Sequence, residues 1–196
     1  MKNWGWGNNL FRLDAEKRKA IIEKFSISGD LFDALSKHYN RIKEGMKKQY
    51  LAHMIRTMEI QLQGLTENPF FKITVTPMPS ASKDLNIACA SYQKNCFFSI
   101  YYPAHLDDKQ LRVCLAHELG HLYLIEYANN ALKNVNFNEK SDTEPLSTIF
   151  GILAILDKND FYATVKGKRL MHKTWEDILK DFELLNKRKK QEYNIS

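Results

Sequence analysis

The amino-acid sequence predicts an α+β fold that is mostly helical, with a small antiparallel sheet of about three strands ahead of a central helix. Apolar residues recur at helical spacing over 14–62, 107–128 and 142–156, whereas residues 71–102 contain short runs that alternate apolar and polar side chains. The 44% hydrophobic content of the 196 residues is typical of a globular protein. We therefore expect one domain over residues 1–196 that buries a core without disulfides.

This domain has three expected parts: an N-terminal helical part (1–64), a sheet with two site-forming helices (70–156) and a basic C-terminal helical segment (157–196). The first part contains helices that we place at residues 14–25, 31–43 and about 46–62, with Asp14 as the N-cap of the first helix. Their apolar stripes indicate core packing. The match of residues 16–38 to a DNA-binding helix-turn-helix is weak.

The middle part begins with strands at 71–76, 85–92 and 96–102, the last two joined by a turn at Gln93-Lys94-Asn95. Asp107 and Gln110 form a capping-box pattern at the start of a helix that continues to about Ala128. If strand 96–102 lies at the sheet edge, it is a candidate to bind an extended peptide through main-chain hydrogen bonds.

The central helix contains the sequence His117-Glu118-Leu119-Gly120-His121. Residues four positions apart on an α-helix lie within about 40° of each other, so His117 and His121 can point at one metal ion, with zinc the best fit. Glu118 lies to one side, where its carboxylate can reach a water on that metal. The surrounding apolar residues predict a buried segment, in which two His and a Glu need a shared partner. Gly120 fits either close helix packing or room beside the metal.

Catalytic zinc needs a third protein ligand. Glu126 fails on geometry, because it faces away from His117 on the helix, whereas Cys114 lies on the correct face but is more often a small buried hydrophobe. Residues 129–140 are loop-like, and a helix with an apolar face opens at Asp142. The candidates for the third ligand are the carboxylates of Glu139, Asp142 and Glu144. Their spacing along the chain ranks Glu144 first but does not exclude the other two.

The segment Ala116–His121 resembles the active-site helix of the ImmA/IrrE family of metallopeptidases. In that family, a later helix supplies a Glu ligand followed by Ala-Asn, then by Phe-Ala-Ala and a Leu-rich end. Glu144, the pair Phe150-Gly151 and residues 153–156 fall in the same register here. The resemblance covers residues 71–156. It implies a zincin-like fold in which Glu144 is the third ligand of one zinc ion per chain.

The chain also departs from the family pattern, because Ser147 and Thr148 replace Ala-Asn and no Met-Pro follows the Leu-rich end. The resemblance implies an intracellular zinc endopeptidase of narrow specificity, in which Glu118 is the general base toward a zinc-activated water. A further donor would stabilise the oxyanion. The sequence leaves that donor open among these residues: Tyr92, Tyr101, Tyr102, Tyr162 and His172.

The expected partner is a protein substrate, and the resemblance points to a helix-turn-helix repressor of a phage or another mobile element. The alternative is a non-catalytic regulatory or interaction protein with structural zinc and a basic surface for a partner or DNA. An intact Glu118 with three protein ligands favours the enzyme, because structural zinc normally has four protein ligands. Cys114 as a fourth ligand would favour the alternative.

The chain has a net charge of +6, and its basic residues cluster at 166–173 and 187–190. We interpret both clusters as solvated surface. No strong nucleic-acid signature accompanies these clusters, so the sequence does not predict direct nucleic-acid binding. Three Cys without zinc-finger spacing indicate a reducing compartment. The N-terminus lacks an apolar signal region, and no apolar run approaches the roughly 20 residues of a membrane span. We expect a cytoplasmic protein, and the sequence does not define its oligomeric state.

Overall fold

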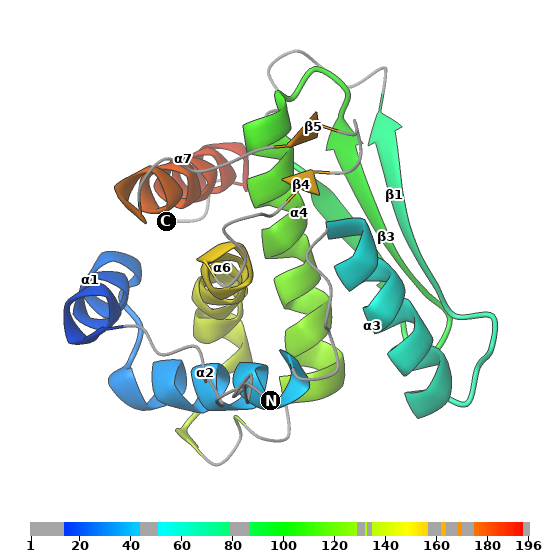
Figure 1. Ribbon diagram of the computed structural model, residues 1–196, viewed down its shortest axis with the longest axis horizontal. Coiled ribbons are helices and arrows are strands. Elements are labelled where there is room, and N and C mark those ends of the chain that lie inside the picture. The colour runs from blue at the N-terminus through cyan, green and yellow to red at the C-terminus, as the bar shows by residue number, and fades with distance from the viewer. Residues whose placement is uncertain are drawn as a thin grey trace, which may run out of the picture.

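The computed structural model describes residues 14–43, 51–78, 87–128, 132, 135–156, 162–163, 168–169 and 175–193. The fold is α+β and mostly helical, as predicted (Figure 1). Its elements are α1 (Ala15–Phe25), α2 (Gly29–Lys43), α3 (Leu51–Leu65), β1 (Lys72–Met78), β2 (Cys89–Gln93), β3 (Phe97–Pro103), α4 (Asp108–Tyr123), the π-helix η1 (Leu124–Ala128), α6 (Glu139–Leu156), β4 (Tyr162–Ala163), β5 (Lys168–Arg169) and α7 (Trp175–Tyr193).

The first two helices begin where short polar side chains cap them. The Asp14 carboxylate accepts a hydrogen bond from the backbone N–H of Lys17, which confirms the predicted start of α1. The Ser28 hydroxyl accepts one from the Leu31 N–H, so α2 begins at Gly29, two residues earlier than predicted. The third predicted helix corresponds to α3, which extends three residues further, to Leu65. Residues 46–50 of that prediction lie outside the described residues.

The sheet has the three predicted strands but is mixed rather than antiparallel. Its order is β1-β3-β2: the predicted turn joins β2 and β3 as an antiparallel hairpin, and β1 pairs with β3 in parallel. A tight turn forces neighbouring strands to be antiparallel, whereas the longer connection from β1 to β2 over residues 79–88 does not. β3 is therefore central, and the prediction that strand 96–102 offers a free edge for substrate is wrong.

The central helix α4 starts with the predicted capping box. The Asp107 carboxylate accepts from the Gln110 N–H at 2.8 Å, and the Gln110 side-chain oxygen accepts from the Asp107 N–H at 3.2 Å. Every residue from Leu111 to Gly120 is buried, because the sheet covers one side of α4 while α6 and α7 cover the other (Figure 1). The helix continues as η1 to Ala128, which agrees with the predicted end.

Helix α6 crosses α4 at Gly120. A side-chain carbon at this position would lie 2.6 Å from the backbone oxygen of Ser147 and 2.8 Å from its Cα. Gly120 therefore serves close helix packing, one of its two predicted roles. α6 begins at Glu139 rather than Asp142, because the Asn138 side chain accepts from the Lys140 N–H and caps the helix earlier.

The C-terminal helix α7 packs on α4 and α6 along one apolar stripe. Ile178, Phe182 and Leu185 on this stripe are buried, and so is Lys189, which follows them at helical spacing. The prediction that all of residues 187–190 are solvated is therefore wrong for Lys189, which is only 8% exposed. Lys187 and Lys190 are exposed, in agreement with that prediction.

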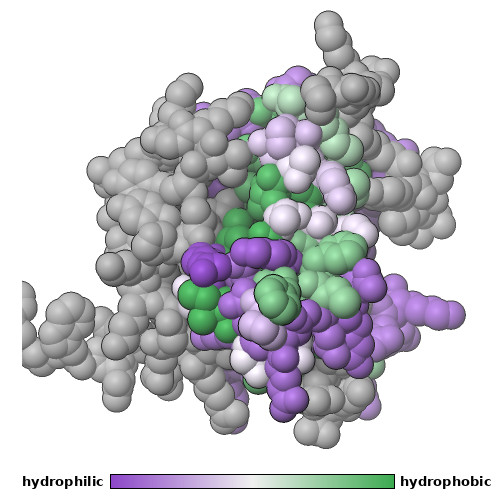
Figure 2. Space-filling model, turned by 90° about the vertical axis from the view of Figure 1, so that its right-hand side faces the viewer, coloured by the Kyte–Doolittle hydropathy of each residue, from purple (hydrophilic) through white to green (hydrophobic). Residues whose placement is uncertain are grey.

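Hydrophobic residues from α1 to α7 form one connected core. Figure 2 views the molecule from the side of β1 and α3, and shows hydrophobic surface in the middle of this face with hydrophilic side chains gathered below it. Across the described part of the chain, no helix combines the length and apolar character needed to cross a membrane.

Replacing Gly120 by alanine should force α4 and α6 apart, because the added carbon meets backbone that cannot rotate away. We expect the free energy of unfolding to fall by about 1–3 kcal/mol, measured by denaturant titration. Gly64 in α3 is the matched control, since a side chain there would meet nothing within 4 Å. Gly64→Ala should raise stability by about 0.5–1 kcal/mol. Equal effects of the two changes would contradict the packing role.

Candidate metal centre

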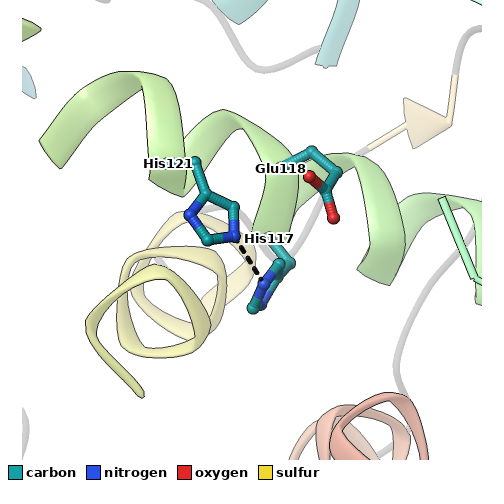
Figure 3. Close-up of side chains that lie close together, drawn as sticks. All are labelled: His117, Glu118 and His121. Atoms are coloured by element: carbon teal, nitrogen blue, oxygen red, sulfur yellow. Dashed lines mark hydrogen bonds between the residues drawn. The ribbon is translucent and has the colours of Figure 1, made fainter. Parts of the chain in front are cut away.

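His117 and His121 project from successive turns of α4, and their Nε2 atoms lie 3.1 Å apart (Figure 3). His117 is fully buried, and the side chain of His121 is 17% exposed. The Nδ1 atoms of both rings contact other groups, so the two Nε2 atoms face the same small space. This is the arrangement predicted from the spacing of the motif.

Helix α6 brings Glu144 to the same space. Its Oε2 lies 3.2 Å from His117 Nε2, and its Oε1 lies 3.3 Å from His121 Nε2. Asp142, which spacing alone could not exclude, instead accepts a hydrogen bond from the Asn138 backbone N–H. The structure thus brings Glu144 to both histidines from the first turns of a helix that Gly120 holds against α4.

Ser147 and Thr148 on α6 contact the Nδ1 atoms of the two imidazoles, on the side of each ring away from Nε2. Thr148 Oγ1 lies 3.1 Å from His117 Nδ1 and donates its own proton to Asn186 Oδ1 at 3.1 Å. The Thr148 oxygen must then accept from His117 Nδ1–H, which leaves the Nε2 lone pair free. Ser147 Oγ contacts His121 Nδ1 at 3.1 Å.

Ser147 and Thr148 were seen in the sequence only as departures from the family pattern, and their contacts to the histidines were not predicted. The available signal was their position three and four residues after Glu144, which places all three on one helical face. Such partners fix the tautomer and orientation of metal-binding histidines. Thr148 and Ser147 are placed to do this for His117 and His121.

The two Nε2 atoms and the Glu144 carboxylate are spaced as the ligands of a tetrahedral metal are. The two Nε2 atoms are 3.1 Å apart, and each lies 3.2–3.3 Å from a different oxygen of Glu144. Ligand atoms in a tetrahedral zinc site with bonds of about 2.0–2.1 Å lie about 3.3–3.4 Å apart. Burial and the nearby Lys189 charge lower the pKa of His117 to about 4, so its imidazole is neutral near pH 7. Burial alone would raise the pKa of Glu144, but its close contacts with His117 and His121 and the positive charge of Lys189 outweigh burial and hold that pKa below its usual range. These are the protonation states that metal binding requires.

Glu118 is buried beside the two histidines on α4. Its carboxylate lies within 4.8 Å of the ligand atoms of both histidines (Figure 3). Its Oε1 accepts a hydrogen bond from Lys189 Nζ at 3.0 Å. The carboxylate therefore lies where it can act on a molecule held by the histidines.

Lys189 is a further site residue that the sequence did not predict, because the basic cluster 187–190 is interpreted there as solvated surface. Its Nζ lies 2.8 Å from His117 Nε2 and 3.4 Å from Glu144 Oε2, in addition to its contact with Glu118. Burial lowers the pKa of Lys189, but the carboxylates of Glu118 and Glu144 outweigh burial and raise it. The available signal was the position of Lys189 at the end of the apolar stripe of α7.

Two residues weighed as ligands lie elsewhere. Glu126 accepts a hydrogen bond from the Tyr92 hydroxyl. Cys114 lines a separate pocket with Asp107 and Arg188, and burial raises the pKa of its thiol to about 12. A thiol with this pKa is protonated near neutral pH, and metal binding requires the thiolate.

A pocket of about 300 Å³ opens onto the site between β2, α4 and η1. Its apolar lining includes Ala88, Ala90, Tyr92, Phe98 and Ile125, and Glu118, His121, Glu144 and Lys189 also contact it. Of the described residues proposed as oxyanion donors, Tyr92 lines this pocket, whereas Tyr101 and Tyr102 do not. The side chains of Tyr162 and His172 lie outside the described residues.

The helix with two histidines and a glutamate, behind a small sheet, defines a metallopeptidase-like domain. Residues 71–187 match the family described as the IrrE N-terminal-like domain (Peptidase_M78). The chain therefore belongs to this family, which confirms the resemblance and extends it into α7. Neither a curated protein nor a solved structure matches the chain.

Replacing Thr148 by valine keeps the side-chain shape but removes the hydroxyl that accepts from His117. We expect the free energy of unfolding to fall by about 1–3 kcal/mol, because the buried Nδ1–H loses its partner. Zinc affinity should fall by about 10–100-fold, because the ring is no longer oriented. Denaturant titration and competition with a zinc chelator measure the two effects.

Thr143→Val is the matched control, since the Thr143 hydroxyl bonds only the Glu139 carbonyl among the contacts described on α6. This change should leave zinc affinity unaltered. A Thr148→Val protein that binds zinc as tightly as Thr143→Val would show that Thr148 does not orient His117.

Proposed function

We propose that the protein is a zinc-dependent endopeptidase of narrow specificity. In this proposal His117, His121 and Glu144 bind one zinc ion per chain, and Glu118 is the general base. The observation that carries the proposal is the convergence of the two Nε2 atoms and the Glu144 carboxylate, at contacts of 3.1–3.3 Å, with the Glu118 carboxylate beside them. Membership of a metallopeptidase family supports it.

The number of available ligands favours catalytic over structural zinc. A structural site normally has four protein ligands, whereas a catalytic site has three and an open position. Cys114, the residue that would have completed a structural site, lines the pocket on the α7 side of α4. The site pocket also gives the open position a route to solvent.

The proposed reaction is hydrolysis of a peptide bond. Zinc bound at this site would lower the pKa of a water molecule and polarise the scissile carbonyl. Glu118 accepts the proton of the attacking water and then donates it to the leaving nitrogen as the C–N bond breaks. The buried position of Glu118 keeps bulk water away from this proton transfer.

The substrate we propose is an extended segment of a protein. In the described part of the chain, β2 pairs on one side with β3 and lies at the edge of its sheet. Three residues of β2, Cys89, Ala90 and Tyr92, line the site pocket. An extended peptide can pair with such an edge through main-chain hydrogen bonds. The family resemblance extends this proposal to a helix-turn-helix repressor of a phage or mobile element as the cognate substrate.

Glu144→Ala and Cys114→Ala test the ligand set. We expect Glu144→Ala to weaken zinc binding at least about 100-fold, because one of three ligands is lost. Cys114→Ala should leave zinc affinity within about threefold of the wild type. Chelator competition and metal analysis of purified protein measure both, with about one zinc per wild-type chain expected. The reverse order of effects would contradict the assignment of Glu144.

Glu118→Gln tests the general base. The variant should retain one zinc per chain, but cleavage should fall by about 10²–10⁴-fold because glutamine cannot accept the proton. Cleavage is measured by mass spectrometry on a library of unstructured peptides. Glu139→Gln, which removes an exposed carboxylate on α6, is the control and should cleave normally. Wild-type cleavage by Glu118→Gln would refute the assigned role.

A further inference from the structure

The ammonium group of Lys189 lies directly against the proposed metal site. It lies 2.8 Å from His117 Nε2, 3.0 Å from Glu118 Oε1 and 3.4 Å from Glu144 Oε2. The side chain reaches this point from α7 through the packed interface with α4, and only 8% of the residue is exposed. A single buried cation thus contacts one histidine and both carboxylates.

Lys189 and a metal ion compete for one lone pair. A neutral imidazole with its proton on Nδ1 has one acceptor site, at Nε2. Thr148 fixes the His117 proton on Nδ1, so the remaining lone pair can accept from Lys189 or bind a metal, but cannot do both. The contact with Glu144 Oε2 at 3.4 Å places the ammonium beside a second proposed ligand, although a carboxylate has further acceptor sites.

The charges of the site explain why a cation is held there. Glu118 is buried, and a buried carboxylate without a cationic partner is costly. Lys189 supplies that partner from within the chain. Lys187 and Lys190 are exposed, so the inward position belongs to Lys189 within this cluster. Lys189 also lies two residues beyond the end of the family match, so the family match does not include it.

We propose that Lys189 is a built-in competitor for the metal, which gives the site a closed, metal-free state with its ammonium between His117, Glu118 and Glu144. This inference rests on the proposed function, because it concerns uptake of the zinc assigned there. Metal binding therefore requires the Lys189 side chain to leave His117. The apparent metal affinity is then reduced by the fraction of molecules in the closed state.

The test compares Lys189→Met and Lys189→Gln with the wild type, using zinc alone as the probe. Both variants keep most of the length of the side chain and remove its charge. We expect zinc to bind at least about tenfold more tightly, measured by chelator competition, because the competitor is absent. The melting temperature of the chelator-treated variants should fall by several degrees, whereas that of the zinc-loaded variants should match the zinc-loaded wild type.

Lys190→Met is the matched control, since it removes an exposed charge from the same turn and should change neither quantity. The opposite shifts in zinc affinity and metal-free stability distinguish competition from a simple structural role, which would lower both. If Lys189→Met does not fold without metal, Lys189→Gln carries the comparison.

The outcomes separate this inference from the function on which it rests. Equal zinc affinity in the wild type and both Lys189 variants overturns the competitor role and leaves the zinc site intact. Weaker binding in the variants also overturns it. Zinc binding by neither the wild type nor the variants overturns the proposed function together with the inference. Zinc binding by the variants alone supports a strong competitor.

Discussion

The site depends on the close contact between α4 and α6 at Gly120. Because Gly120 has no side chain, the backbone of Ser147 can approach within a distance that any Cβ would prevent. This contact sets the position of a full turn of α6, so Glu144, Ser147 and Thr148 reach the histidines together. Two adjacent helical turns therefore supply the converging donor atoms and their orienting partners. A small shift between the helices would disturb all these contacts at once.

Electrostatics adds a second constraint to this packing. The contact between the helices collects one buried carboxylate, one partly exposed carboxylate and two imidazole lone pairs in a small space. Such a group is stable only with a cation. Lys189 meets this requirement within the chain, and a divalent metal would meet it from solution. The carboxylates of Glu118 and Glu144 can therefore either pair with Lys189 and stabilise the metal-free fold, or favour the binding of a metal ion.

The sequence predicted the features whose causes are local. The capping box of Asp107 and Gln110 determined where α4 begins, and the helical spacing of His117 and His121 placed their rings together. The direction of β1 was not predictable, because residues 79–88 are long enough to permit either orientation. Lys189 was missed for another physical reason: its charge suggests solvent, and only the packing of α7 against α4 and α6 reveals that it is buried. Ser147 and Thr148 could have been found from their helical face.

A metal site that already contains an internal cation links folding to metal uptake. Whatever free energy Lys189 contributes to the metal-free fold must be overcome when zinc displaces it, because both bind the same groups. Stability of the metal-free chain and affinity for zinc are therefore opposed at this residue. Lys189, the residue at which these two quantities are opposed, lies on α7 and beyond the end of the family match at residue 187. A chain can adjust its demand for zinc at such a position without altering His117, His121 or Glu144.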